Sequence, residues 1–510
     1  MHGLASSLVN LVVAAVYSLL VVRLSLDYLG KQEYGLLSLL AQISAYIAIL
    51  DLGLTIAFGR ILIDYTRDSS ELYARALRTA SLVFTLLGFL GFVIAAFIAL
   101  FGKSSLSIPS SLNKEFTNLM LLQGGILFAT FWLKSVSAPL IANGKHYVIY
   151  WVSSATFILN AGIFWISLHY GFGIYSSAFG QAIALLLNAA LLWRLSSPYR
   201  VAATVKTSFD RKIFREVFAF TKDTMIWQIG GQTMASLPIL LAASWFALGA
   251  TADLSAGLKL VLLAVAVCTR FGDMSVTPLS IEYAHGNKDV AVRQMTRITR
   301  IAGGIGVCAA IFTTCANPSF LNWWMLGKIA WPWHANLTAA LWIAILTITQ
   351  CLYGFAVISR QLKLIRWALL AECGLYVSVS AVASRGGNPS ALLWIKPVAT
   401  LCVGIYVALR IRKYTSFDTL LLLPDIFRQT LVMVVFLPTG IITSIHISTA
   451  TASPILAFLL NFGFASILTV IALPFVFTGE TRLDILQTLY RTMKKICGIF
   501  KITSTNHETS

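Results

Sequence analysis

Ionisable side chains interrupt the long apolar stretches of this 510-residue sequence at several points. A charge in the middle of a membrane-spanning helix costs roughly 2.5 to 3.5 kcal/mol on insertion scales, so each one needs a partner or a function. The basic members, which could bind an anion, are Lys134, Lys259, Arg270 and Lys396, with Arg23 near the end of an apolar run. The acidic members, which could bind a proton or a sodium ion, are Asp51, Asp273 and Glu372. Basic residues outnumber acids inside the apolar runs, which favours an anion as the bound species.

Lys134 is the strongest candidate for contact with an anion. It shares one helical face with Gln123, Thr130 and Ser137, and no acid lies one turn away on its own helix. Lys396 is second, because the proline that follows it disturbs the start of its helix. The alternative for such a polar face is hydrogen bonding between helices, which uses the same residue types.

A second polar face lies between residues 222 and 248. Thr224, Gln228, Gln232 and Ser236 recur there at helical spacing. Polar stripes in a membrane helix need either a wet surface or a neighbouring helix to contact. We expect Gln123, Gln228 and Gln232 to line a hydrated path.

Each remaining charge has a structural alternative. Arg270 and Asp273 are three residues apart and could neutralise each other on one helix. Lys259 lies near the end of its span and could extend its ammonium group to the interface. Asp51 could pair with a neighbouring helix. The sequence leaves these alternatives open.

The composition requires a membrane around most of the chain. It is 58% hydrophobic and 11% charged, with a mean hydropathy of +0.80, which is too apolar for a soluble domain. About 14 runs are long enough to cross a hydrocarbon core of roughly 30 Å. They cover approximately residues 4–24, 36–58, 79–102, 117–142, 147–169, 174–195, 222–248, 254–279, 301–323, 337–359, 366–383, 391–409, 430–450 and 454–477. The sequence therefore predicts an all-α polytopic membrane protein.

The net charge of +18 indicates how the chain is oriented in the membrane. If the N-terminus is cytoplasmic, most of the 38 Lys and Arg fall in cytoplasmic loops and tails, as the positive-inside rule requires. An even number of spans then returns the C-terminus to the cytoplasm. The excess charge faces anionic lipid headgroups, so we predict no nucleic-acid partner.

The two halves of the chain repeat each other weakly. Residues 65–75 resemble residues 283–293, and residues 141–151 resemble residues 357–367, at nearly equal offsets. A tandem duplication of two six-helix lobes is the simplest account. We expect an N-lobe over 1–195, a cytoplasmic linker over 196–221, a C-lobe over 222–409, a C-terminal helix pair over 410–477 and a cytoplasmic amphipathic tail over 478–510.

Two of these segments have a distinctive composition. The basic linker is expected to hold a surface helix that Asp210 caps, with Ile213, Phe214, Val217 and Phe218 on its apolar face. The last helix pair contains no Lys or Arg between Arg428 and Arg482, so we expect it to face lipid or a lipid tail.

The most distinctive motif lies between Leu29 and Arg60. This stretch predicts a polar turn followed by a single spanning helix. Its elements are Leu29, Gly30, Tyr34, Gly35, Tyr46, Asp51, Leu52, Gly53, Leu54 and Arg60. This pattern resembles the N-terminal signature of polysaccharide exporters, the Wzx-type flippases of the multidrug/oligosaccharidyl-lipid/polysaccharide (MOP) superfamily. A looser resemblance extends over most of the chain, and the extra helix pair resembles the fourteen-helix lipid II flippases.

The resemblance implies two pseudo-symmetric six-helix lobes around a V-shaped cavity that opens by alternating access. It implies translocation of an undecaprenyl-diphosphate-linked oligosaccharide, the repeat unit of an O-antigen, capsule or exopolysaccharide, from the inner to the outer leaflet. The intramembrane basic residues would then contact the diphosphate. The implied location is the bacterial inner membrane, and the implied partners are membrane lipids and the polymerase and chain-length proteins of the same pathway.

Three other functions stay open. A multidrug antiporter of the same superfamily should have an acid-dominated cavity, and a lipid II flippase would share the extra helix pair. A membrane-embedded glycan polymerase or ligase should carry a sizeable outer loop, whereas the predicted outer loops are short. We predict no catalytic residue, metal or cofactor. The P-loop pattern GxxxxGK[ST] does not occur, so ATP hydrolysis is not expected, and coupling to protons or sodium stays open.

Overall fold

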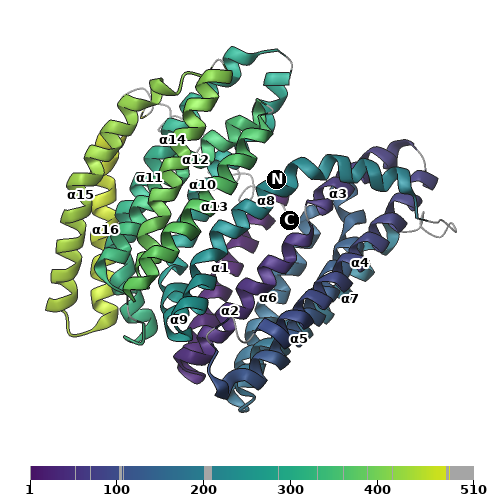
Figure 1. Ribbon diagram of the computed structural model, residues 1–510, viewed down its shortest axis with the longest axis horizontal. Coiled ribbons are helices and arrows are strands. Elements are labelled where there is room, and N and C mark those ends of the chain that lie inside the picture. The colour runs from purple at the N-terminus through teal and green to yellow at the C-terminus, as the bar shows by residue number, and fades with distance from the viewer. Residues whose placement is uncertain are drawn as a thin grey trace, which may run out of the picture. The chain divides into compact units, whose positions relative to one another are not determined.

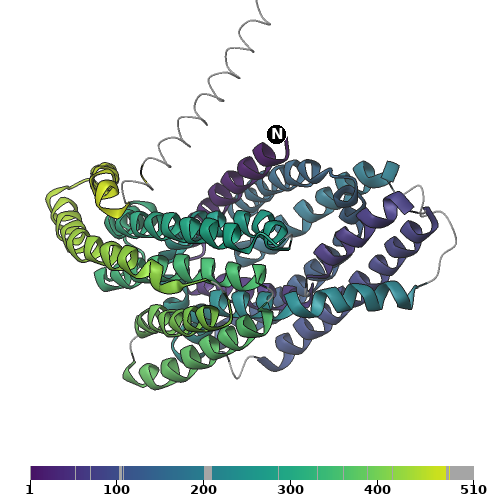
Figure 2. The same ribbon diagram turned by 90° about the horizontal axis from the view of Figure 1, so that it is seen from above.

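The computed structural model describes residues 2–477, with gaps at 52, 69, 103–105, 107, 200–208, 285, 330, 360, 388 and 416, together with Arg482. Every regular element in these residues is helical (Figure 1, and from above in Figure 2). Twelve of the helices are long and apolar enough to cross a membrane, and the bent pair Leu248–Gly257 and Lys259–Thr269 adds a thirteenth if it forms one span. The prediction of an all-α, multi-pass membrane protein is confirmed, and the predicted count of about 14 is close.

The chain divides into two compact units. Unit 1 comprises Met1–Lys259, Trp324–Trp331 and Arg366–Ile395, and unit 2 comprises Leu260–Trp323, Pro332–Ile365 and Lys396–Ser510. The helices of unit 1 are α1 (His2–Tyr28), α2 (Lys31–Ala48), α3 (Leu54–Asp68), α4 (Ser70–Phe101), α5 (Asn113–Ala142), α6 (His146–His169), α7 (Ser176–Ser196), α8 (Arg211–Trp245), α9 (Leu248–Gly257) and most of α13 (Leu362–Ala383). Unit 2 holds most of α10 (Lys259–Ala284), α11 (Lys288–Met325) and α14 (Ala391–Tyr414), and all of α12 (Trp333–Ile358), α15 (Leu423–Ala450) and α16 (Pro454–Val476). The lobe boundaries inferred from the internal repeat stay a prediction.

Short 3-10 turns join or extend several of these helices. They are η1 (Ile49–Asp51), η3 (Ser110–Leu112), η4 (Gly173–Tyr175), η5 (Ser197–Tyr199), η7 (Ser384–Gly386) and η8 (Thr419–Leu422). Two of them matter below, because η1 precedes α3 and η8 precedes α15.

Unit 1 buries one face of its helices and exposes another apolar face. Leu36, Leu39 and Phe116 are at most 1% exposed where α2 packs against α5. Leu86 and Phe97 of α4 are instead 66% and 63% exposed. An exposed apolar surface of this kind is unfavourable in water and suits contact with lipid.

Helix α8 corrects one expectation about the linker. Asp210 caps it as predicted, because Asp210 Oδ1 accepts hydrogen bonds from the Lys212 and Ile213 backbone N–H groups. The helix does not end at a surface segment but continues for 35 residues to Trp245. Ile213 and Val217 are 2% and 0% exposed and belong to the core formed with α3 and α4. The expectation of a separate surface helix was wrong, because α8 continues without a break and Ile213 and Val217 pack on protein. Phe218 of the same predicted face is 48% exposed.

The C-terminal helix pair packs on α11 with one face. Ser444 of α15 donates a hydrogen bond to the Cys315 carbonyl of α11, and Asn461 of α16 donates to Ser448 Oγ. Such bonds are typical of contacts between membrane helices. The opposite face of α15 exposes Leu431 and Val434. The predicted amphipathic tail over 478–510 lies outside the described residues, apart from Arg482.

Candidate functional site

The second apolar segment, predicted over 36–58, is broken near Gly53. Helix α2 ends at Ala48, and the turn η1 leads to Asp51. The backbone then passes through Gly53 at φ +83°, a left-handed conformation that glycine adopts without steric cost, before α3 begins. The expectation of one continuous helix over about 36–58 was therefore wrong. Apolar periodicity reports which face is buried and does not reveal a break at one glycine.

Asp51 stabilises the start of α3. Its Oδ1 accepts hydrogen bonds from the Thr55 backbone N–H at 3.2 Å and from the Thr55 hydroxyl at 2.8 Å. The unpaired N–H groups and the positive end of the helix dipole at this point also favour a carboxylate. Non-helical backbone at membrane depth is tolerated where protein or water covers it, and in transporters such discontinuous helices form ion and substrate sites.

Lys134 of α5 supplies the opposite charge. Its Nζ lies 3.1 Å from Asp51 Oδ2 and 4.8 Å from the centroid of the Phe131 ring. The side chains of Lys134 and Asp51 are 26% and 16% exposed, so the ion pair is only partly enclosed. No acid lies one turn from Lys134 on its own helix, but η1 provides the Asp51 carboxylate. The structure therefore places Asp51 beside a neighbouring helix, one of the alternatives that the sequence left open.

The predicted polar face of α5 is used mainly within the bundle. Gln123 Nε2 donates a hydrogen bond to Gln181 Oε1 of α7 at 3.2 Å. Thr130 and Ser137 bond to carbonyl groups of their own helix. Among these residues only Lys134 contacts a charged partner.

The polar face of α8 is described in part. Gln232 Nε2 donates a hydrogen bond to Ser236 Oγ at 2.8 Å, and the Gln232 side chain is half-buried. The side chains of Gln228, Arg270 and Asp273 lie outside the described part of the structure, so their predicted roles stay predictions.

Arg23 and Lys259 each have a polar partner in unit 1. Arg23 Nε lies 3.7 Å from Asp27 Oδ2, one helical turn away, and Lys328 Nζ lies 2.7 Å from Asp27 Oδ1. Lys259 Nζ donates a hydrogen bond to Ser18 Oγ of α1 at 3.1 Å. The Lys259 ammonium group thus contacts protein.

Lys396 and Glu372 are the most buried of the predicted charges. Lys396, on α14 in unit 2, is 3% exposed, and its Nζ lies 3.8 Å from the centroid of the Trp342 ring. That geometry is a cation–π contact, which strengthens when water is excluded. Glu372, on α13 in unit 1, is 4% exposed. Both side chains are therefore buried within the protein and are not exposed to acyl chains.

The sequence did not reveal one charged cluster in unit 2. Asp425 lies at the start of α15. Its Oδ2 is 2.8 Å from Arg300 Nε of α11, and its Oδ1 is 2.9 Å from Arg428 Nη2. The spacing of Asp425 and Arg428, three residues apart beside a basic loop, was the available signal. All three residues lie outside the predicted apolar runs or at their ends.

No family model and no curated protein matches this sequence. Solved structures do match its fold. An inward-facing multidrug resistance MATE family transporter of the MOP superfamily aligns with a TM-score of 0.66 at 13% identity, covering 79% of this chain and 96% of the other. The lipid II flippase MurJ, in an inward closed conformation, aligns with a TM-score of 0.65 at 12% identity, covering 92% of this chain and 97% of the other. The Vibrio cholerae MATE transporter VcmN, in a mutant form, aligns with a TM-score of 0.58 at 16% identity, covering 81% and 96%. The chain therefore has the fold of the MATE and MurJ transporters.

Proposed function

We propose that this protein is a flippase that moves an undecaprenyl-diphosphate-linked oligosaccharide from the inner to the outer leaflet of a bacterial inner membrane. Both termini are cytoplasmic in this proposal. The observation that carries it is the position of Lys134, a partly enclosed cation beside Asp51, where the candidate span Lys31–Asp51 ends before α3. A phosphorylated lipid headgroup needs such a cation on its path across the hydrocarbon region.

The Lys134–Asp51 ion pair suits a site that exchanges partners. Asp51 keeps the Thr55 hydrogen bonds and the dipole of α3 when Lys134 leaves, so the carboxylate is not left without stabilisation. Lys134 can then bind a phosphate oxygen in a charge-assisted hydrogen bond. Protonation of Asp51 would release Lys134 in the same way, and this makes Asp51 the first candidate for proton coupling.

The extent of the fold match favours a lipid-linked substrate. The MurJ structure, whose name states lipid II as its substrate, covers 92% of this chain, whereas the MATE structures above cover 79% and 81%. The membrane potential also favours outward movement of the proposed substrate. With a negative cell interior, outward movement of an anion gains about 2.3 kcal/mol per charge per 100 mV, unless charges of the protein cancel it.

The test is deletion of the gene in its host, followed by measurement of the leaflet in which the undecaprenyl-linked oligosaccharide accumulates. We expect accumulation on the inner side, rescue by the wild-type gene and no rescue by Lys134→Ala. Lys114→Ala is the matched control, because Lys114 is exposed near the start of the same helix.

A double variant separates a transport role of the Lys134–Asp51 pair from a purely structural ion pair. Asp51→Asn with Lys134→Leu removes both charges, so no buried charge is left unpaired. If Lys134 binds the cargo, or if Asp51 couples a proton, this variant folds but does not restore export. Restored export would refute the role given to Lys134, and unchanged leaflet distribution after gene deletion would refute the flippase.

A multidrug antiporter is the second candidate, because a MATE family transporter aligns with a comparable TM-score of 0.66. It predicts resistance to cationic compounds on overexpression and normal glycan export in the deletion strain. Both results together would favour it over the flippase.

A further inference from the structure

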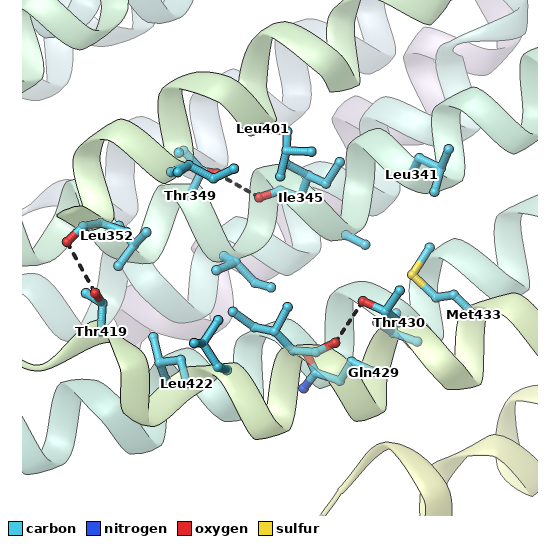
Figure 3. Close-up of a pocket in the computed structure, with 18 of the residues that line it drawn as sticks. Leu341, Ile345, Thr349, Leu352, Leu401, Thr419, Leu422, Gln429, Thr430 and Met433 are labelled. Carbon is cyan, nitrogen blue, oxygen red and sulfur yellow. Dashed lines mark hydrogen bonds between the residues drawn. The ribbon is translucent and has the colours of Figure 1, made fainter.

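Unit 2 contains an apolar cavity of about 630 Å³ that the proposed transport function does not use. The volume falls within the roughly 300 to 1,000 Å³ of typical ligand pockets. Figure 3 shows side chains that converge on it from α12, α14, η8 and α15, including Leu341, Ile345, Leu401, Leu422 and Met433. All of its lining residues belong to unit 2.

The polar groups in the wall are already satisfied by backbone. Thr349 donates to the Ile345 carbonyl at 2.9 Å, Thr430 to the Ile426 carbonyl at 2.8 Å and Thr419 to the Ala408 carbonyl at 3.2 Å. The hydroxyl groups therefore need no polar ligand, and the interior suits a hydrocarbon chain.

The mouth of the cavity lies on an exposed apolar surface. Ile405 and Leu409 of α14 and Val434 of α15 line the cavity and are 53%, 57% and 65% exposed. In a membrane protein such a surface contacts acyl chains, so a chain can enter from the bilayer without crossing water.

A net positive cluster lies beside one end of the cavity. Arg300 Nη2 donates to the Leu421 carbonyl in η8, between Leu420 and Leu422 of the cavity wall. Gln429, also in the wall, donates to the Arg300 carbonyl. The two guanidinium groups of Arg300 and Arg428 share the single carboxylate of Asp425, which leaves one net positive charge.

The guanidinium groups remain reachable while the carboxylate is enclosed. The side chains of Arg300 and Arg428 are 35% and 30% exposed, whereas that of Asp425 is 10% exposed. Arginine presents a planar fork of donors that matches a phosphate group. A phosphate would therefore meet donors first, with Asp425 behind them.

We propose that this cavity and the Arg300–Asp425–Arg428 cluster form a binding site for an anionic phospholipid of the leaflet beside the basic loops. One acyl chain occupies the cavity, and the phosphate binds the two arginines. The site binds an apolar chain and an anionic headgroup of the same lipid. A zwitterionic lipid with the same chains therefore binds less tightly. The bound lipid fills the space between α15 and the pair α12 and α14.

Native mass spectrometry of the purified full chain tests this site without measuring transport, so its outcome is independent of the proposed function. The detergent-solubilised protein is titrated with phosphatidylglycerol, with phosphatidylcholine of the same chains, and with undecaprenyl phosphate. We expect one phosphatidylglycerol to bind at least about tenfold more tightly than phosphatidylcholine, a difference equivalent to about 1.4 kcal/mol.

Variants locate the bound lipid. Leu341→Trp fills the cavity and Val434→Trp closes its mouth, and each should weaken phosphatidylglycerol binding at least about tenfold. Val470→Trp is the matched control, because Val470 is 62% exposed on α16 and does not line the cavity. Arg428→Gln should abolish the preference for phosphatidylglycerol, whereas Arg412→Gln, at an exposed ion pair with Asp418, should retain it.

Three results would overturn the proposal. Equal binding of phosphatidylglycerol and phosphatidylcholine would remove the role of the arginines. Wild-type binding by both Leu341→Trp and Val434→Trp would remove the role of the cavity. Displacement of phosphatidylglycerol by stoichiometric undecaprenyl phosphate would assign the site to an isoprenoid carrier instead.

Discussion

At the scale of residues, the Lys134–Asp51 pair differs from a surface ion pair in the energetic cost of removing one partner. A partner lost from a fully buried pair costs about 3 to 5 kcal/mol, because the remaining charge stays in a poor solvent. Both side chains here keep some exposure, which reduces that cost. The proposed function therefore requires a pair that fixes α5 against the helix break and still opens for an anion.

Lys134→Leu should lower the free energy of unfolding by about 1 to 3 kcal/mol, which is less than for a fully buried pair because of this exposure. Asp51→Asn combined with Lys134→Leu should recover most of that loss. Thermal unfolding in detergent provides the measurement, with Lys114→Leu as the control. A double variant no more stable than Lys134→Leu alone would show that the two side chains do not interact energetically.

The pair also marks what the sequence could predict at this scale. Lys134 and Asp51 were both singled out, because a charge inside an apolar run is costly wherever it lies. Their pairing could not be derived, since it depends on how α5 packs against the segment around η1. The Asp425 cluster was missed for a related reason: its acid and one of its arginines looked like parts of a solvated basic loop.

At the scale of elements, the break between α2 and α3 depends on one backbone conformation. Gly53→Ala places a Cβ at φ +83°, which costs roughly 1 to 2 kcal/mol for an L-residue. We expect a lower unfolding temperature and reduced glycan export, because the displaced turn moves Asp51 away from Lys134. Gly125→Ala on α5 is the control, since a Cβ there meets no atom within 4 Å. Wild-type export by Gly53→Ala would show that the break is not part of the site.

The C-terminal helix pair provides a second test of packing. A Cβ on Gly440 of α15 would overlap Cys315 Sγ of α11. Gly440→Val should therefore separate these helices and lower the unfolding temperature by several degrees, as overpacking typically costs about 1 to 3 kcal/mol. Gly463→Val on α16 should be tolerated, because nothing lies within 4 Å of its Cβ position. Equal effects of both substitutions would contradict this account of the α11–α15 contact.

Hydropathy was sufficient to locate most of the candidate spans, because about twenty apolar residues have few stable alternatives to crossing the bilayer. It was insufficient at Gly53 and at Ile213. The first is a local backbone event inside an apolar run. The second is an apolar face, and a pattern of that kind does not distinguish a lipid surface from a protein surface.

At the scale of the whole molecule, the topology depends on α8. Twelve helices and one bent pair have the length and composition of spans among the described residues, and α8 is the additional segment needed for an even number. Its 35 residues extend over roughly 52 Å at 1.5 Å per residue, well beyond the roughly 30 Å of a hydrocarbon core. The polar residues Lys222, Asp223 and Gln228 lower its apolar character without shortening it.

The charge distribution decides between the two topologies. If α8 did not cross, every later loop would change sides, and the basic segments around Arg293 and Arg412 would face outward against the positive-inside rule. We therefore predict that α8 crosses the membrane. In a cysteine-free background, Lys212→Cys should react with a membrane-impermeant thiol reagent only after the cells are opened, and Ala247→Cys should react in intact cells. Lys114→Cys and Arg293→Cys serve as outer and inner references. Labelling of both α8 positions from the same side would place the two termini on opposite sides of the membrane and remove the even count.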